Sequence, residues 1–224
     1  MEPDYAALRA KMVDSQVRTT DVTDHAIVSA LLSVPREEFV PATRRALAYI
    51  DEDLLLTPAA GANPARWLME PSPFAKLLQL ARITPDSVVL DVGCATGYSA
   101  AVLSRIAQSV IAVEQDEALA QLATSTLTGL GYDNAVVVTG PLAEGYPSEA
   151  PFDVILLEGA VETIPQALLD QLKDGGRLVA AEGTGNAAVA KAWIRDGASI
   201  SAVRGFNAAV KPLPGFEKAA EFQF

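Results

Sequence analysis

The sequence predicts an α/β fold with a doubly wound, mostly parallel sheet and an N-terminal helical addition. Five apolar runs recur between residues 88 and 181, helical periodicities separate them, and a glycine turn follows the first run. Strands that alternate with helices form βαβ units, which place their strands parallel in one sheet. A run that is apolar throughout is typical of a strand buried on both faces.

Each predicted element has its own signal along the chain. Residues 5–33 are predicted to be helical because apolar residues recur there at spacings of three and four. Residues 51–64 are predicted to be a loop because two prolines and a glycine punctuate them. The predicted strands cover 88–92, 110–114, 135–138, 152–157 and 177–181, and the predicted helices cover 73–82, a segment ending at 107, 116–130 and 164–172. The tail from residue 187 is less regular and has room for one or two antiparallel edge strands.

Composition argues against several classes of protein. The formal net charge is −11 and no run of Lys or Arg occurs, which disfavours nucleic-acid binding and adhesion to anionic membranes. No apolar run approaches the roughly 20 residues that a membrane helix needs. One histidine, His25, argues against a histidine-based metal site, and we expect no metal. A single cysteine and an N-terminus without a signal-peptide pattern predict a cytoplasmic location.

The glycine turn has the sequence Asp91-Val92-Gly93-Cys94-Ala95-Thr96-Gly97. Open parallel sheets bind ligands at the carboxyl ends of their strands, and glycines allow the backbone to approach a ligand closely. Glu114 closes the next predicted strand, 21 residues after Gly93. Because an ionised carboxylate only accepts hydrogen bonds, Glu114 suits both ribose hydroxyls of an adenosine.

Three interpretations of this turn remain open. Asp91, just before the glycines, suits a cationic sulfonium amino acid better than a pyrophosphate, which favours S-adenosylmethionine. A nicotinamide dinucleotide is the rival, but its Gly-x-Gly-x-x-Gly fingerprint fits poorly, since Ala95 stands at the third position and Ala100 three residues after Gly97. The third interpretation is a glycine turn without a ligand.

Several stretches resemble the protein-L-isoaspartate O-methyltransferase family from about residue 12 to about residue 183. The similar segments are Met12-Val13 with Gln16-Val17 and Asp24, Val34–Pro41, Ala48–Asp51, Gly93–Leu103, Ala150–Asp153, and Pro165 with Gln171-Leu172 and Gly175–Val179. The resemblance implies a Rossmann-like, S-adenosylmethionine-dependent methyltransferase that esterifies carboxylates of damaged aspartyl residues in proteins, a repair activity. It implies a protein or peptide substrate and leaves the oligomeric state open.

The expected architecture is a single domain over residues 1–224. It consists of an N-terminal helical and loop segment (1–70), a cofactor-binding core (71–186) and C-terminal edge strands (187–224). The expected cofactor-binding residues are Asp91, Gly93, Cys94, Ala95, Gly97, Glu114, Gln115, Pro141, Leu142 and Glu158. No catalytic residue is assigned, because a carboxylate acceptor is already ionised at pH 7 and its methylation needs placement and desolvation more than a base.

The chain departs from the family's pattern at two places. Met69-Glu70-Pro71 stands where the family has Ser-Gln-Pro, so the hydroxyl is missing and Glu70 would repel an incoming carboxylate; Ser72 lies close behind. Gly140-Pro141-Leu142 stands where the family has Gly-Asp-Gly after the third strand. The alternative function is therefore a divergent member that binds S-adenosylmethionine but acts on another acceptor, or a non-catalytic binding module.

Overall fold

The protein is described by a computed structural model over residues 3–61 and 63–218. Its N-terminal helices are α1 (Tyr5–Met12) and α2 (His25–Ser33). The helical stretch predicted over residues 5–33 is interrupted between them by a π-helical turn, a 3₁₀ turn and a left-handed residue, Asp21. Asp24 caps α2 by accepting hydrogen bonds from the N–H groups of Ala26 and Ile27.

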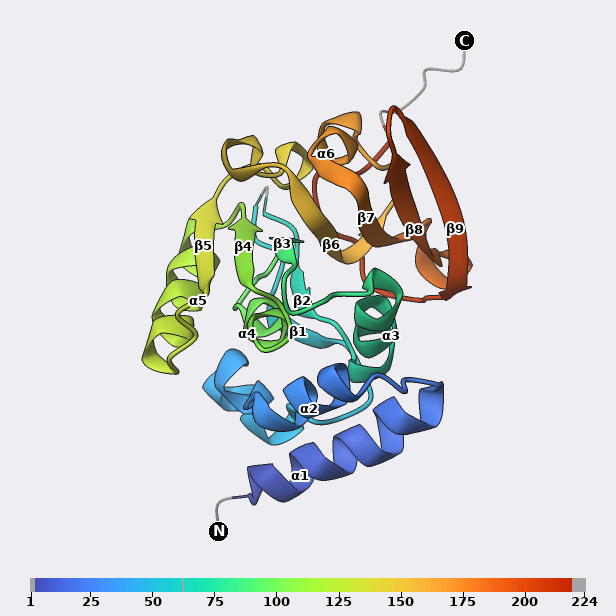
Figure 1. Cartoon of the computed structure of the whole chain (residues 1–224). Helices are drawn as coiled ribbons and strands as arrows, with labels where there is room; N and C mark the ends of the chain where they lie inside the picture. Colours follow the sequence, from blue (N-terminus) through green and yellow to red (C-terminus); the bar gives the residue numbers. More distant parts are fainter. Residues whose placement is uncertain (1–2, 62, 219–224) are drawn as a thin grey trace.

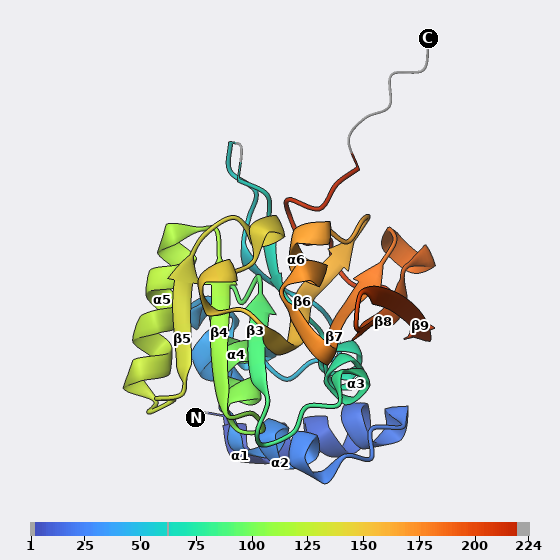
Figure 2. The same cartoon turned by 45° about the horizontal axis from the view of Figure 1, so that its top comes forward.

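A two-stranded hairpin, β1 (Leu54–Thr57) and β2 (Arg66–Leu68), lies within and just after the predicted loop. Its strands are antiparallel, with Leu54 opposite Leu68 and Thr57 opposite Arg66. The loop prediction for 51–64 is wrong at β1, where alternate leucines are buried and pack as a strand. Figure 2 shows this hairpin rising past the carboxyl ends of the central strands.

The central sheet has seven strands in the order β5-β4-β3-β6-β7-β8-β9. The strands are β3 (Val88–Val92), β4 (Ser109–Glu114), β5 (Ala135–Thr139), β6 (Phe152–Val161), β7 (Leu172–Glu182), β8 (Val189–Asp196) and β9 (Ser199–Asn207). β3 to β7 pair in parallel, and β8 and β9 add antiparallel strands at one edge. This arrangement, visible in Figure 1, confirms the predicted doubly wound, mostly parallel sheet.

Helices and turns cover both faces of this sheet. The remaining α-helices are α3 (Pro71–Ala81), α4 (Tyr98–Ser104), α5 (Glu117–Gly129) and α6 (Gln166–Asp170). One core joins α1 to α5 with alternate residues of the strands, such as Val89 and Leu156. A second core joins α6 and a C-terminal segment with the intervening residues, such as Leu90 and Leu157. The carboxyl ends of β3 and β6, where the strand order reverses, lie between the two cores.

Several predicted boundaries differ from the structure; the helix predicted to end at residue 107, for example, ends at Ser104. The predicted helix over 164–172 shrinks to α6, because β7 already begins at Leu172. A Cβ on Gly176 would lie 2.9 Å from the carbonyl oxygens of Lys173 and Phe152, so glycine permits this close passage of strands. β6 continues to Val161 beyond its predicted end at residue 157, which places Glu158 inside the strand. In the described part of the chain, no helix combines the length and the apolar character needed to cross a membrane.

Candidate functional site

The glycine turn at the carboxyl end of β3 packs closely against α5. Gly93, Ala95 and Gly97 have φ values of 87°, 49° and 92°, in the left-handed region. A Cβ on Gly97 would lie only 3.1 Å from Cβ of Ala123, so this turn needs glycine for its conformation and for its packing. Ala95 is held in place because its N–H donates to Oε2 of Glu114 at 2.8 Å.

Glu114, at the end of β4, is completely buried and fully engaged. Its carboxylate accepts hydrogen bonds from the N–H groups of Ala95, Gln115 and Asp116. The guanidinium of Arg66 binds both carboxylate oxygens, with Nη2 2.7 Å from Oε2, and also donates to the carbonyl of Gly93 at 3.2 Å. The carboxylate that the sequence assigns to a ribose is therefore paired with an arginine of the same chain.

Five buried polar atoms of the described residues lack hydrogen-bond partners, and three of them belong to groups that influence one another: Asp91 Oδ1, Glu158 Oε1 and Arg36 Nη1. The other oxygen of Asp91 accepts from Ser99 Oγ at 2.6 Å. The remaining nitrogens of Arg36 donate to the carbonyls of Ala48 and Met69, each at 2.7 Å. Buried polar groups are usually satisfied, so this cluster is a candidate ligand site.

Burial shifts the acid–base properties of this cluster. The pKa of Asp91 is raised to about 7, mainly by burial; the hydrogen bond from Ser99 opposes this shift, and the nearby charge of Glu114 adds to it. Burial also raises the pKa of Glu158 well above its ordinary value, with Asp91 adding to the shift and Arg36 opposing it. The pKa of the Cys94 thiol is raised by burial and by Asp91, so Cys94 is a neutral, packed side chain rather than a reactive thiolate.

A segment after β9, Val210–Phe216, lies over the glycine turn and the end of β6. Val210, Leu213 and Phe216 are buried. The N–H of Ala160 donates to the carbonyl of Lys211, and the N–H of Leu213 donates to the carbonyl of Ala160, both at 2.8 Å. A Cβ on Gly93 would lie 2.5 Å from Cδ1 of Leu213. The space left beside Glu158 and Arg66 is about 10 Å³, which is barely one water molecule.

The structure thus brings part of the predicted site together. Glu158 lines the small space beside Arg66, which is called the crevice below. Glu114 and Gly93 accept hydrogen bonds from Arg66, Ala95 donates to Glu114, and Asp91 lies near Glu114 and Glu158. Leu142 is buried in the same core as Leu213. Gln115 and Pro141 are exposed. Sequence reasoning missed Arg66 and the segment Val210–Phe216. The one usable signal was Arg66 itself, a charged residue followed by apolar Trp67 and Leu68.

The residues that depart from the family's pattern lie beside the crevice. Met69 lines the same small space as Glu158, whereas Ser72, within α3, is not among the described residues that line it. The N–H of Glu70 donates to Oδ1 of Asp53 at 3.0 Å just before α3 begins. Burial raises the pKa of Glu70, and the carboxylates of Asp53 and its neighbours raise it further.

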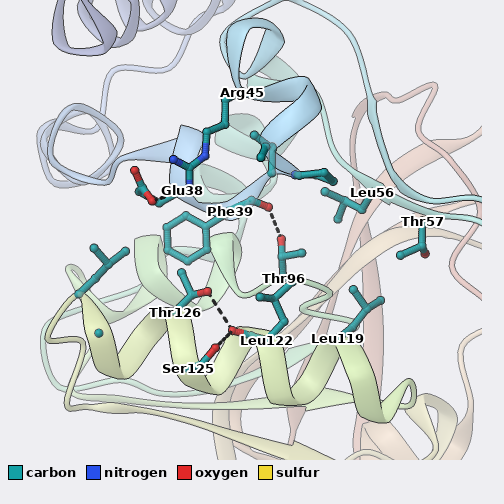
Figure 3. Close-up of a pocket in the computed structure, with 15 residues that line it drawn as sticks. Glu38, Phe39, Arg45, Leu56, Thr57, Thr96, Leu119, Leu122, Ser125 and Thr126 are labelled. Carbon is teal, nitrogen blue, oxygen red and sulfur yellow. Dashed lines mark hydrogen bonds and ion pairs between the residues drawn. The ribbon is translucent and has the colours of Figure 1, made fainter. Parts of the chain in front are cut away.

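A separate groove of about 680 Å³ opens between α5 and the 3₁₀ helices Arg36–Phe39 and Ala42–Leu47. Figure 3 shows its lining, including Leu119 and Leu122 of α5 on one side and the Glu38–Arg45 ion pair on the other. The hydroxyl of Thr96, in the glycine turn, donates to the carbonyl of Phe39 at 2.6 Å. The groove thus borders the glycine turn at Thr96, and its lining is mainly apolar.

Within residues 3–61 and 63–218, no group of three or more His, Cys, Asp or Glu side chains is arranged to hold a metal ion. Arg66 and Arg36 instead supply the positive charge beside the buried carboxylates.

Comparison with known sequences identifies close relatives over most of the chain. The chain is 41% identical over 175 residues to a protein-L-isoaspartate O-methyltransferase of Koribacter versatilis (strain Ellin345), covering 78% of this chain and 76% of the relative. A protein of the same name from Roseiflexus sp. (strain RS-1) is 35% identical over 212 residues, covering 95% of this chain and 94% of the relative.

Solved structures agree. A protein-L-isoaspartate O-methyltransferase structure matches with a TM-score of 0.80 at 25% identity, covering 92% of this chain and 66% of that longer one. A Plasmodium falciparum β-aspartate methyltransferase solved with S-adenosyl-L-homocysteine shares the fold, with a TM-score of 0.72 at 18% identity over 94% of this chain and 98% of that one. The sequence model of protein-L-isoaspartate(D-aspartate) O-methyltransferases matches residues 8–206. The chain therefore belongs to the protein-L-isoaspartate(D-aspartate) O-methyltransferase family.

Proposed function

We propose that this protein transfers a methyl group from S-adenosylmethionine to a carboxylate of a damaged aspartyl residue in a protein or peptide. The observation that carries the proposal is a set of carboxyl groups on adjacent strands of a chain in this family: Asp91 and Glu114 are buried, and Glu158 is half-buried with its Oε1 atom inside. The relatives are named as enzymes and match over most of their length, which favours turnover over a non-catalytic binding module.

The residues of the crevice fit this cofactor in their chemistry. The unpartnered oxygens of Asp91 and Glu158 are acceptors that suit a cationic amino-acid group. Glu114 suits ribose hydroxyls, although Arg66 now occupies both of its oxygens. The glycine turn lets the backbone approach a ligand, and Leu142 offers an apolar side chain near it. When bound, the cofactor supplies an electrophilic methyl group on a sulfonium.

The protein's own contribution to such a transfer is placement and exclusion of water. A carboxylate acceptor is already a nucleophile at neutral pH, so the site needs no strong base. The apolar side chains of Met69 and Trp67 border the crevice and exclude water there. Arg36 and Lys211 supply positive charge near an incoming carboxylate, whereas Glu70 and Asp53 oppose it. The side of the crevice that would face the substrate therefore carries both positive and negative groups and is not a uniformly basic surface.

The test is methyl transfer from labelled S-adenosylmethionine to an isoaspartyl peptide, with the same peptide containing normal aspartate as its matched control. We expect a base-labile methyl ester on the first peptide only. Equal labelling of both peptides would remove the damaged aspartate from the proposal. No labelling of either, with cofactor binding intact, would point to another acceptor.

The role of Glu70 in substrate choice has a test of its own. In Glu70→Gln one like charge is removed beside the crevice, so the KM for an isoaspartyl peptide should fall severalfold with little change in kcat. Glu52→Gln, which removes another carboxylate near Glu70, is the control. A KM that is the same in all three proteins would mean that Glu70 does not face the substrate.

The proposal includes repair of aged proteins as the biological role and the cytoplasm as the location. Repair follows from the acceptor, because an isoaspartyl ester collapses to a succinimide. The cytoplasm is supported only by the single cysteine, Cys94, which is buried and free.

A further inference from the structure

We propose that Arg66 and the segment Val210–Phe216 form a plug that closes the cofactor crevice, and that S-adenosylmethionine binds only when this plug leaves. The inference concerns regulation of the site in the proposed function and rests on that function. Arg66 and Val210–Phe216 are called the crevice plug below. Its two halves compete with different parts of the same ligand.

The first half competes for hydrogen bonds. Both oxygens of Glu114 are bound by Arg66, and three backbone N–H groups take further positions around them. A ribose would have to donate its hydroxyls to those same oxygens. The pairing of a guanidinium with a carboxylate is bidentate and charge-assisted, so a neutral sugar does not displace it without a change elsewhere.

The second half competes for space. Leu213 contacts the glycine turn and also Gly159, where a Cβ would lie 2.9 Å from Cβ of Leu213. Phe216 and Leu213 join Val92 and Leu142 in one buried cluster. Sites for cofactor-sized ligands usually have several hundred Å³, whereas about 10 Å³ remains here. The segment therefore excludes the ligand even where Arg66 does not reach.

The two halves are linked. Trp67 follows Arg66 on β2, and the ammonium of Lys211 lies 4.9 Å from the centre of the Trp67 ring. This cation–π contact is lost when either the segment or the hairpin moves away, so movement of one favours movement of the other. The plug is thus expected to leave as a unit.

Three features of the closed structure favour its opening. The hairpin β1–β2 has only two strands, which is a marginal structure without tertiary contacts. Pro212 and Pro214 have no N–H to donate to β6. The closed crevice also leaves Asp91 Oδ1 and Glu158 Oε1 without partners, and opening exposes both to water or to a ligand. An enzyme that is mostly closed binds its ligand with an affinity reduced by the open fraction.

Calorimetric titration with S-adenosylhomocysteine tests the plug in the wild type and in two variants, Arg66→Ala and Leu213→Ala. Each variant weakens one half, and we expect each to bind at least about tenfold more tightly than the wild type. Arg45→Ala is the matched control, since Arg45 makes a half-exposed ion pair beside the separate groove. Its affinity should stay within about twofold of the wild type.

Hydrogen exchange gives a second readout that needs no variant. The N–H groups of Leu213 and Ala160 bond between the segment and β6. In the wild type, saturating S-adenosylhomocysteine should speed exchange of the Leu213 amide. If Arg66→Ala does not fold, Leu213→Ala and this measurement carry the test.

The outcomes separate the plug from the proposed function. Equal affinity in the wild type and both variants, with unchanged or slower exchange at Leu213, overturns the plug and leaves methyl transfer standing. Tighter binding in the variants without methylation of any peptide supports the plug and overturns the function. Absence of binding in all proteins overturns both.

Discussion

The crevice and the groove lie on opposite sides of the glycine turn and differ in almost every respect. The crevice is narrow, is bordered by the carboxyl groups of Asp91, Glu114 and Glu158, and is filled by side chains of the same chain. The groove is open, mainly apolar and about 680 Å³ in volume. Buried oxygens without partners occur on Asp91 and Glu158 beside the crevice, whereas the groove has one such atom, Arg45 Nε, among the described residues that line it. The larger space is therefore not the one that the buried carboxyl groups border.

The difference also concerns how each region is held. The groove is bordered by α5 and short helices that pack through apolar side chains. The crevice is held by an ion pair, Arg66–Glu114, between residues 48 positions apart. Buried ion pairs contribute little net stability, but removing one partner alone is costly because it leaves the other charge buried and unpaired.

The largest effect is expected from breaking this ion pair on one side. Glu114→Ala leaves the buried guanidinium of Arg66 unpaired and frees three N–H groups, which should lower the free energy of unfolding by about 3–5 kcal/mol. The exposed pair partner Glu38 is the control, and Glu38→Ala should cost about 0–1 kcal/mol. Urea unfolding measures both.

A double variant sharpens this prediction. Arg66→Met combined with Glu114→Gln removes both charges and should recover at least about half of the lost stability. Equal costs for Glu114→Ala and Glu38→Ala would show that the crevice is not held by a buried charge pair.

The next effect concerns the glycine turn, which lies between the crevice and the groove and packs against α5. Gly97→Ala places a Cβ against Ala123 of α5 in addition to its unfavourable φ, and should cost about 2–4 kcal/mol in urea unfolding. Gly131→Ala is the matched control, since Gly131 has a similar φ but no atoms within 4 Å of the added Cβ. It should cost about 1–2 kcal/mol. If both variants lose the same free energy of unfolding, contact with α5 does not add to the cost of a side chain at residue 97.

A third effect depends on pH. Asp91 has its pKa raised to about 7 in the folded protein, so the folded state holds a proton that the unfolded chain releases near pH 4. The stabilisation from this proton is complete below pH 4 and is lost as pH rises to about 7, at up to about 1.4 kcal/mol per pH unit. The charged groups facing Asp91 and its neighbour Glu158 are Glu114 of β4 and Arg36.

Glu158→Gln removes the second raised carboxyl and should flatten this dependence between pH 5 and 8. Urea unfolding at four pH values measures the slopes, with Glu38→Gln as the exposed control. A variant slope equal to that of the wild type would mean that Glu158 does not titrate with the cluster.

The smallest effect is expected in the groove. Leu122 is 49% exposed, and Leu122→Gln keeps a good helix former in α5, so the free energy of unfolding should change by about 0.5 kcal/mol or less. The affinity for S-adenosylhomocysteine should stay within about twofold. A large loss of affinity would make the groove part of the cofactor site and end the distinction between the two regions.

The sequence predicts the parallel sheet well because its signals are local. Apolar runs such as Val88–Val92 predict buried strands, and Gly93 and Gly97 predict the turn. The acids Glu114 and Glu158 follow from strand topology, so their place at one edge of the sheet was predictable. These features need only short windows of sequence.

The closure of the crevice was not predictable in the same way. Arg66 follows a stretch whose prolines and glycine indicate a loop, and nothing local says that it reaches Glu114. Leu213 contacts Gly93 from far along the chain. Such contacts depend on how finished elements pack, and periodicity of side chains does not encode them.

The position of Val210–Phe216 after β9 has a consequence for biosynthesis. The chain leaves the ribosome from its N-terminus, so all strands of the parallel sheet emerge before this segment does. A nascent chain that has not reached residue 210 can carry the whole parallel sheet and Arg66 while the space that Leu213 fills beside Gly93 is still free. Synthesis of residues 210–216 then supplies the second half of the plug.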